Sequence, residues 1–480
     1  MAGLLAGIAP VTGILNAVTA SIDGLVRIAD EFGGLFPSII DRRRATMLET
    51  LPDAIAGQRD GDRSHLGSNL IHDEALLLTM FALADSEGRP DYAVAADRYL
   101  KRFAMHCANT PTGILPWGEH AFWHLVEDRV GNSNEIRGSE SPSTHDHLRQ
   151  APLWLLEKLY GFRPESLIRF GEGLDGHWTE GEPEEYIRHA YIEEDRPYPR
   201  SDRSCDFPRH GGFYIFDWAF LLAKTGRQDF ADRIRKMLDY WWGWRHNDGL
   251  LLTESRSPKE AVNFHGVNAP GQTLSLGVSL LESAPLVMKE APDLAATMEE
   301  RAAIYVDGFF SAPHDYERHQ YVLSCKRNNG EVVGASPIWG SVYGVWPASY
   351  IALTCLCGYG LTSDDRLMDY ARSVGEGYLQ ESFPDDVAVP AMDAGLGLGL
   401  LADLYERTRD KAWLDGAEKM AHTLTDVYFE PDVALPRGAA GIDWYESQMG
   451  PSFLLHGLAK TVLLSRDGAP SALATDYTAR

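Results

Sequence analysis

Carboxylate, histidine and aromatic side chains gather in one short segment, TGILPWGEHAFWHL, which places Glu119 and His120 between Trp117 and Trp123. Aromatic rings beside a carboxylate suit a sugar, because its apolar face packs on an indole while its hydroxyl groups need polar partners. We expect these rings to desolvate Glu119 and to raise its pKa toward that of a general acid. The alternative is an aromatic core patch in which Glu119 caps a helix.

A second segment, YIRHAYIEEDRPYPRSDRSCDFPRHGG, gathers arginine and histidine residues in an otherwise acidic protein. Asp206, Arg209 and His210 stand directly before two glycines, which permit close backbone approach at the start of an apolar helix. Arginine matches a carboxylate bidentately, so we expect Arg203, Arg209 and His210 to hold an acidic ligand. The alternative is a solvated loop whose charges pair with the acidic residues 193–195.

Other polar and aromatic residues stand where a loop enters an expected helix. Taken singly, each fits a structural role, but as a group they recur where the inner helices of a ring would begin. His120 and His124 are four residues apart, yet the intervening AFW lacks the glutamate of a zinc-protease motif, so we expect no metal and no cofactor. Asp146 is a further catalytic candidate, and the further substrate-binding candidates are Trp117, His120, His145, His265, Trp339, Arg437, Trp444 and Tyr445.

Composition limits the function classes. The chain has 480 residues and a formal net charge of −25, a field that repels nucleic acid and anionic membranes. Five cysteines in this length do not suggest a disulfide scaffold. The apolar N-terminus lacks a basic residue before its apolar run, and no later segment has the length of a membrane span. We therefore expect a cytoplasmic protein, and its aromatic-rich loops suggest a homodimer.

Most of the chain carries the three- and four-residue apolar spacing of amphipathic helices. Four segments also share a pattern in which one helix closes, a short polar turn follows, and the next helix opens with an apolar anchor. The spacing of these helical hairpins is too irregular for an extended solenoid, and long inserts separate them. The anchors are Tyr92, Phe230, Leu367 and Trp413, and the expected helices include 69–84, 92–108, 144–160, 212–225, 229–244, 294–310, 348–358, 366–379, 394–407 and 412–428.

Helical hairpins closed into a ring, with long loops over one end, account for both the repeats and the inserts. We therefore predict an all-α fold, an (α/α)6 toroid with little β-structure. We expect residues 1–33 to form an amphipathic helical segment packed on the ring, residues 34–466 to form the toroid, and residues 467–480 to be a tail. Long loops in a compact domain are usually functional, and here they hold most of the unusual residues.

With WGEHAFW and RHGGFYIFDWAFLLAKTG at the junctions of the hairpins, the chain resembles the six-hairpin (α/α) toroid enzymes that act on carbohydrates. Within that group it is most similar to the β-glucuronidases of glycoside hydrolase family 154, over residues 34–464. The resemblance implies an exo-acting enzyme that removes β-linked glucuronic acid from a glycoside or oligosaccharide without a redox cofactor. It does not by itself assign a catalytic residue.

A glycosidase uses one carboxylic acid to protonate the leaving oxygen and a second carboxylate to activate water or attack the sugar. Glu119 and Asp206 are the predicted pair, with Asp146, Asp217 and Asp443 in reserve, and Trp117 and Trp444 are expected to stack on the sugar. A uronate lyase with a Tyr or His base and an Arg to neutralise the carboxylate is the main alternative. A non-catalytic carbohydrate-binding toroid and a sugar epimerase also remain open.

Overall fold

The computed structural model describes residues 2–138, 141–180, 184–197, 206–254, 266–340, 346–468 and 472–473, with side chains from residue 13 onward other than that of Arg137. Six helices within these ranges are buried on nearly every side. Helices that are apolar all round belong inside a protein, because no face of them is suited to water. They are α2 (Leu70–Ser86), α6 (Pro208–Thr225), α8 (Pro270–Val287), α10 (Ala348–Thr362), α12 (Ala391–Thr408) and α14 (Pro451–Asp467).

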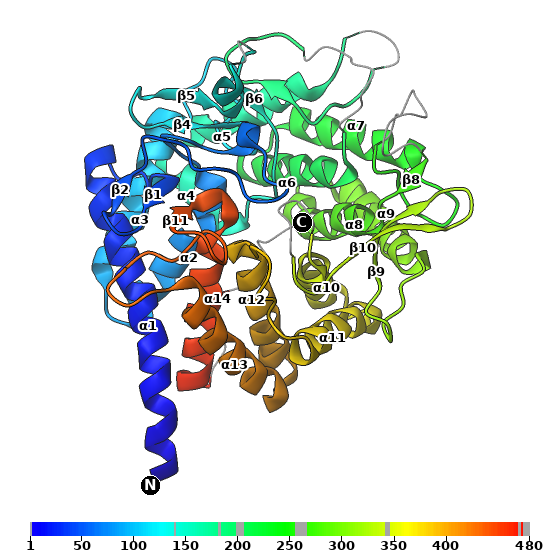
Figure 1. Ribbon diagram of the computed structural model, residues 1–480. Helices are drawn as coiled ribbons and strands as arrows, with labels where there is room; N and C mark the ends of the chain where they lie inside the picture. The colour runs from blue at the N-terminus through cyan, green and yellow to red at the C-terminus, as the bar shows by residue number, and fades with distance from the viewer. Residues whose placement is uncertain are drawn as a thin grey trace.

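The other helices bury one face and expose the other, and they lie outside the inner ring (Figure 1). Most of them follow an inner helix directly and pack against it, as the hairpin pattern predicts. The first helix instead packs on α14, so the beginning and the end of the chain lie side by side. These helices are α1 (Ala2–Ala29), α3 (Pro90–Arg102), α4 (Leu153–Phe162), α5 (Pro164–Gly173), α7 (Gln228–Trp244), α9 (Pro292–Ser311), α11 (Asp365–Gln380) and α13 (Lys411–Tyr428).

The fold is the predicted (α/α)6 toroid with little β-structure. None of the helices in the described part of the chain is both long and apolar enough to cross a membrane. The division of the chain near residues 33 and 466 stays a prediction.

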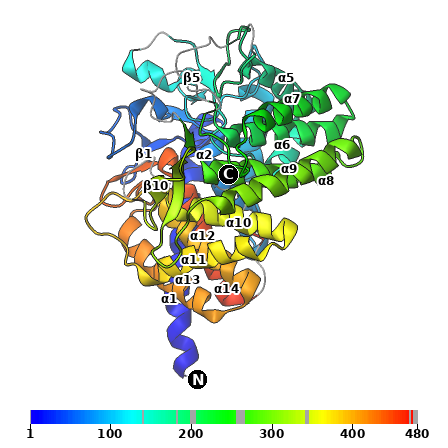
Figure 2. The ribbon, with the colours of Figure 1, turned by 90° about the vertical axis from the view of Figure 1, so that its right-hand side faces the viewer.

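Short strands join the loops at one end of the ring, and Figure 2 shows β1 and β10 on that side while α8 and α10 extend away from it. Every strand pairing is antiparallel. In one sheet β1 lies between β2 and β11, with Ile40 opposite Tyr445, and so links the start of the chain to its end. The strands are β1 (Ile39–Asp41), β2 (Thr46–Met47), β3 (Gly67–Ser68), β4 (Ala121–His124), β5 (Arg129–Asn132), β6 (Thr144–His145), β7 (Ala190–Tyr191), β8 (Val267–Asn268), β9 (Tyr321–Lys326), β10 (Val332–Ser336) and β11 (Trp444–Glu446).

One local prediction was wrong. The helix expected over 144–160 begins only at Leu153, because Pro152 sets the start of α4 and residues 144–145 pair with β7 instead. Residues 121–124, for which no helix was predicted, form strand β4, and their aromatic residues pair across to β5. His120 and His124 therefore do not share a helical face.

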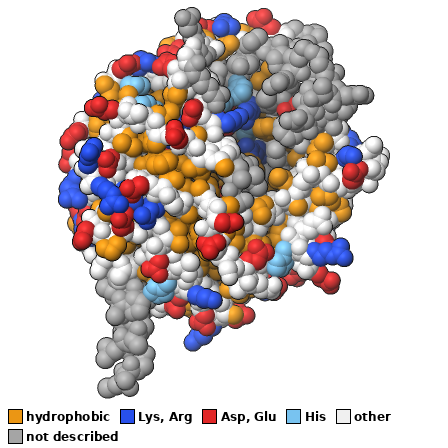
Figure 3. Space-filling view, viewed as in Figure 1, with side chains coloured by type: hydrophobic (Ala, Val, Ile, Leu, Met, Phe, Trp, Pro, Cys, Tyr) orange, Lys and Arg blue, Asp and Glu red, His pale blue; other side chains and the backbone are white. Residues whose placement is uncertain are grey.

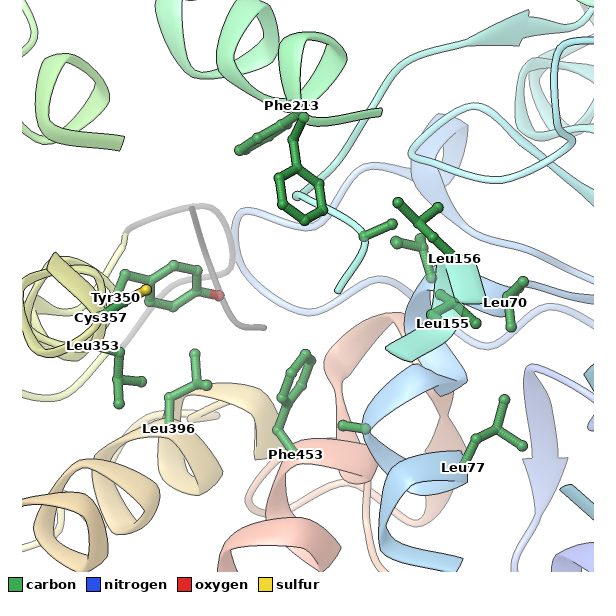
Figure 4. Close-up of a cluster of buried hydrophobic side chains, with 14 of the residues drawn as sticks. Leu70, Leu77, Leu155, Leu156, Phe213, Tyr350, Leu353, Cys357, Leu396 and Phe453 are labelled. Carbon is green, nitrogen blue, oxygen red and sulfur yellow. The ribbon is translucent and has the colours of Figure 1, made fainter. Parts of the chain in front are cut away.

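Apolar side chains from different inner helices meet inside the ring (Figure 4). Leu77 of α2, Phe213 of α6, Leu396 of α12 and Phe453 of α14 are all almost completely buried. Each large apolar side chain stabilises the fold by about 1.5–3 kcal/mol when it leaves water. Tyr350 of α10 also projects toward the middle of the ring.

Two glycines set the close approach of α12 and α14. A Cβ on Gly395 would lie 2.4 Å from the backbone nitrogen of Leu454, and one on Gly457 would lie 2.9 Å from the carbonyl oxygen of Gly395. We expect Gly395→Ala to lower the free energy of unfolding by about 1–3 kcal/mol, because the helices must separate. The measurement is urea unfolding at pH 7.

Gly161 of α4 is the matched control, because a Cβ there meets nothing within 4 Å. Gly161→Ala should be neutral or stabilising, by up to about 1 kcal/mol. Equal effects of the two substitutions would show that close helix packing does not require Gly395.

Candidate functional site

The loops over the ring bring Glu119 and Asp146 together. Glu119 directly precedes β4, and its backbone N–H donates to Oδ1 of Asp146 at 2.8 Å. Gly118 makes this approach possible: its φ is +105°, and a Cβ there would lie 2.0 Å from the carbonyl oxygen of Asp146. Two of the three catalytic candidates from the sequence therefore lie in direct contact.

Three cationic or potentially cationic side chains surround the carboxylate of Glu119. Arg59 donates to Oε1, Nη1 of Arg188 lies 3.5 Å from Oε2, and Nε2 of His120 lies 3.6 Å from Oε2. Burial on its own would raise the pKa of Glu119, but Arg188, His120 and Arg59 together outweigh burial and hold this pKa well below its usual range. Glu119 is therefore ionised, which corrects the expectation of a raised pKa and a general-acid role.

Asp62, on the short helix η2 (Asp60–Asp62), shares Arg59 with Glu119. Nε of Arg59 lies 2.6 Å from Oδ2 of Asp62, whose side chain is 2% exposed. Burial, reinforced by the nearby charge of Glu119, raises the pKa of Asp62 to about 7. Two adjacent carboxyl groups whose pKa values are driven apart are characteristic of an acid and base pair in an enzyme.

Replacing Asp62 should flatten the dependence of stability on pH. Its pKa in the folded protein lies above the unfolded value of about 3.9, so its contribution is fully present below about pH 4 and is lost as the pH rises through 7. We expect wild type to lose more stability than Asp62→Asn between pH 5 and pH 8, as measured by thermal unfolding. Asp60→Asn, at the more exposed neighbour, is the control, and parallel curves for wild type and Asp62→Asn would contradict the expectation.

Trp117 and His145 lie behind the site rather than in it. Both side chains are fully buried. The prediction that Trp117 stacks on a ligand at the surface was therefore wrong. The indole Nε1 of Trp117 donates to Nε2 of His145, Nδ1 of His145 lies 3.1 Å from Nε2 of His177, and Nδ1 of His177 lies 2.8 Å from the carbonyl oxygen of Ile187. Because each proton along this chain has one acceptor, the chain fixes both ring tautomers and holds the loop that carries Asp146.

Arg209 opens helix α6 and forms no ion pair with an acidic side chain among the described residues, although the charges of Glu119 and Asp146 act on it. Its Nε donates to Nε2 of His210 at 3.3 Å, and its guanidinium lies 4.1 Å from the centre of the Trp346 ring. Burial, together with the charge of Arg188, lowers the pKa of Arg209 to about 9. Arg209 still carries its charge at neutral pH, and 7% of its surface stays exposed. Such a guanidinium is poised for an anionic ligand.

The loop face of the molecule is hollowed near its middle (Figure 3). Lysine or arginine side chains line this hollow, and histidine lies close by, in a protein whose net charge is −25.

His210 is fully buried, and burial together with the charge of Arg209 holds its pKa well below its usual range. Neutral His210 therefore serves as the acceptor that orients Arg209.

Asp206 lies just before α6 and accepts a hydrogen bond from the Tyr240 hydroxyl at 2.9 Å. Burial and the charge of Asp206 raise the pKa of Glu254 to about 8, while Arg188 acts in the opposite direction. Arg188 therefore interacts with Glu254 as well as with Glu119. Glu119 and Glu254 thus both feel the charge of Arg188, and Asp206 is linked to this group through Glu254.

Other sequence candidates make their contacts with different residues. Arg437 donates hydrogen bonds to the carbonyl oxygen of Val427 and to the carboxylate of Glu430. The indole N–H of Trp444 donates to the carboxylate of Glu446. Trp339 packs on Tyr378 and Phe383 beside a cavity of about 300 Å³ between α11 and α13. Tyr445 is fully buried, and Arg203 and His265 lie outside the described residues.

Two groups of side chains place their nitrogen or oxygen atoms within 4.8 Å of one another: His120 with Asp146 and His189, and His120 with Asp62 and Glu119. Both could hold a metal ion. Arg59 and Arg188 already bring positive charge to the same carboxylates, so the arrangement favours an anionic or polar ligand over a cation.

Sequence reasoning missed Arg59, Asp62 and Glu254. Arg59 and Asp62 belong to the polar run QRDGDRSH, whose density of charge is the one signal that could have pointed to them. Glu254 follows the apolar residues of LLTES and carries no such signal. Its relation to Asp206, 48 positions earlier, exists only in the folded chain.

No protein-family model and no curated protein matches the chain. Among solved structures, α-1,2-mannosidase from Trichoderma reesei aligns with a TM-score of 0.53 and 13% identity, over 95% of this chain and 93% of its own. The unsaturated glucuronyl hydrolase of Bacillus sp. GL1, responsible for the degradation of glycosaminoglycan, aligns with a TM-score of 0.47 and 12% identity, over 97% and 100%. A sugar epimerase from a ruminal bacterium gives 0.45 and 11%, over 95% and 98%. At 13% identity the likeness to the mannosidase shows the fold alone.

Proposed function

We propose that the protein is a glycoside hydrolase that removes terminal β-linked glucuronic acid from glycosides or oligosaccharides. The observation that carries the proposal is Arg209, a nearly buried guanidinium without an acidic partner among the described residues. It opens onto a cluster that holds both ionised and protonated carboxyl groups. A sugar that bears a carboxylate satisfies Arg209 and presents its glycosidic bond to those groups. The resemblance to glycoside hydrolase family 154 points the same way.

In the proposed reaction Arg209 binds the C6 carboxylate of the glucuronate, and neutral His210 holds the guanidinium in place. Glu119 is the ionised carboxylate on the sugar side and either activates water or attacks the anomeric carbon. Arg59 and Arg188 orient the carboxylate of Glu119, and their positive charges also make this carboxylate a weaker base. Asp206 is the second carboxylate of the site, placed next to the start of α6 by its bond to Tyr240.

The test is to incubate the purified protein with an oligosaccharide that ends in a β-glucuronate and to weigh the products. Hydrolysis gives masses that sum to the substrate plus one water. The control is the same oligosaccharide ending in β-glucose, which lacks the carboxylate and should remain intact. Release of both sugars at equal rates would overturn the role of Arg209, and binding without turnover would identify a carbohydrate-binding toroid instead.

A uronate lyase is the second candidate, and His189 is the observation that favours it. Burial and the charge of Arg188 hold the pKa of His189 well below its usual range, so its ring is neutral and could accept a proton at pH 7. It lies beside Arg188, which could neutralise a uronate carboxylate in place of Arg209. The same mass measurement separates the two reactions, because elimination gives products that sum to the substrate alone, with one of them unsaturated.

A further inference from the structure

Hydrolysis at this site needs a proton donor, and the predicted pair does not contain one. Glu119 is surrounded by Arg59, Arg188 and His120, and Asp206 already uses Oδ2 to accept from Tyr240. We propose that Glu254 is the catalytic acid of the proposed glycosidase, a role that rests on the proposed function and completes it.

The backbone that leads up to Glu254 is anchored beside the start of α8. The N–H of Thr253 donates to the carbonyl oxygen of Val267 at 2.9 Å, and Leu252 forms an isolated bridge with Asn268. The N–H of Leu251 donates to Oγ1 of Thr273, within the first turn of α8. Short pairing to β8 thus fixes the residue immediately before Glu254, as a catalytic group requires.

The carboxyl group of Glu254 is 3% exposed, and its Oε2 is buried without a hydrogen-bond partner among the described residues. A buried carboxyl oxygen without a partner is costly unless a ligand satisfies it or the group is neutral. Asp206 and Arg188 are the charged groups that act on it, and the negative charge of Asp206 favours retention of the proton. Burial and the influence of Asp206 thus both favour the neutral, protonated form of Glu254.

Other carboxyl groups of this region whose pKa values are raised by burial are already engaged. Asp62 bonds to Arg59, and Asp146 accepts from the backbone of Glu119. Asp217 lies 2.9 Å from Nε2 of His147. Each would have to break an existing bond to reach a glycosidic oxygen, whereas Glu254 would gain one.

In the proposed step the proton of Glu254 passes to the glycosidic oxygen as the bond between this oxygen and C1 of the glucuronate breaks. A water molecule supplies the hydroxyl group that bonds to C1. Its other proton passes to Glu254, either directly or through Glu119 and solvent, and so restores Glu254 to the acid form. One water is consumed for each bond broken. Asp206 acts through Glu254, so it is a positioning residue in this step.

The experiment compares wild type, Glu254→Gln and Asp62→Asn on methyl β-glucuronide and 2,4-dinitrophenyl β-glucuronide. Methoxide must be protonated to leave, whereas dinitrophenolate leaves without help. Loss of the acid should lower kcat/KM on the methyl substrate by about 10²–10⁴-fold and change the dinitrophenyl rate little. A structural role would lower both rates together.

Equal losses of Glu254→Gln on both substrates, or no loss on either, would overturn the role of Glu254 while wild-type activity keeps the proposed function. A leaving-group dependence found in Asp62→Asn instead would transfer the acid role to Asp62. An inactive wild type on both glucuronides would overturn the proposed function itself. Glu254→Asp keeps a carboxyl group, and it should recover part of the methyl-substrate rate if Glu254 is the acid.

Discussion

Arg209→Met should lower kcat/KM for a β-glucuronide by about 10²–10³-fold, equivalent to about 3–4 kcal/mol. The charge of Arg209 is nearly buried and has no acidic partner among the described residues, so a substrate carboxylate is its natural counter-ion. Methionine keeps most of the packing volume on Trp346 and removes the charge. The measurement is steady-state kinetics on matched β-glucuronide and β-glucoside substrates, with the ratio of their kcat/KM values as the readout.

Arg209→Lys is the matched variant. It keeps the positive charge but loses both the bidentate fork and the flat stack on Trp346, so we expect a loss between those of wild type and Arg209→Met. A proportional loss on glucoside and glucuronide would mean that Arg209 supports the fold of the site rather than selecting the carboxylate. Because burial and Arg188 lower the pKa of Arg209 to about 9, selectivity for the glucuronide should also fall as the pH rises through 9.

Lys460→Met should destabilise the protein by about 3–5 kcal/mol at pH 7. Lys460 of α14 bonds to Asp403 and lies 2.7 Å from Glu406, both on α12, and its side chain is 1% exposed. The pKa of Lys460 is raised because the two acids outweigh the effect of burial. Without the lysine, Asp403 and Glu406 lose the positive charge that compensates their carboxylates in the interior. The measurement is the free energy of unfolding in urea.

The loss should shrink in acid. Burial raises the pKa of Asp403 in the folded protein even with Lys460 present, and removal of the lysine raises this pKa further. A group with a raised folded-state pKa contributes most stability below its unfolded pKa and loses it as the pH rises, so the variant recovers toward pH 4. The triple variant Lys460→Met, Asp403→Asn and Glu406→Gln is the control and should be markedly more stable than the single one at pH 7. A deficit that is independent of pH would point to lost packing instead of uncompensated charge.

The ring itself could be read from the sequence. The apolar spacing over 69–84, 212–225 and 348–358 predicts helices that the structure places at α2, α6 and α10, and the repeated turn pattern predicts their hairpins. Helix periodicity is a local property of neighbouring residues, so the sequence carries it directly. The clustering of charged and aromatic residues in the inserts also marked, from sequence alone, the end of the ring at which Glu119, Asp206 and Arg209 lie.

The chemistry of those residues was decided by the tertiary structure. Glu119 was expected to have a raised pKa from its aromatic neighbours in the chain, but Arg59 and Arg188, 60 and 69 positions away, lower it. Trp117 was expected at the surface and is fully buried. Electrostatic interactions depend on distance in space and on burial, and neither follows from spacing along a chain. The sequence by itself therefore determined the helical ring and where its polar residues gather, whereas only folding decided which carboxyl group carries a proton.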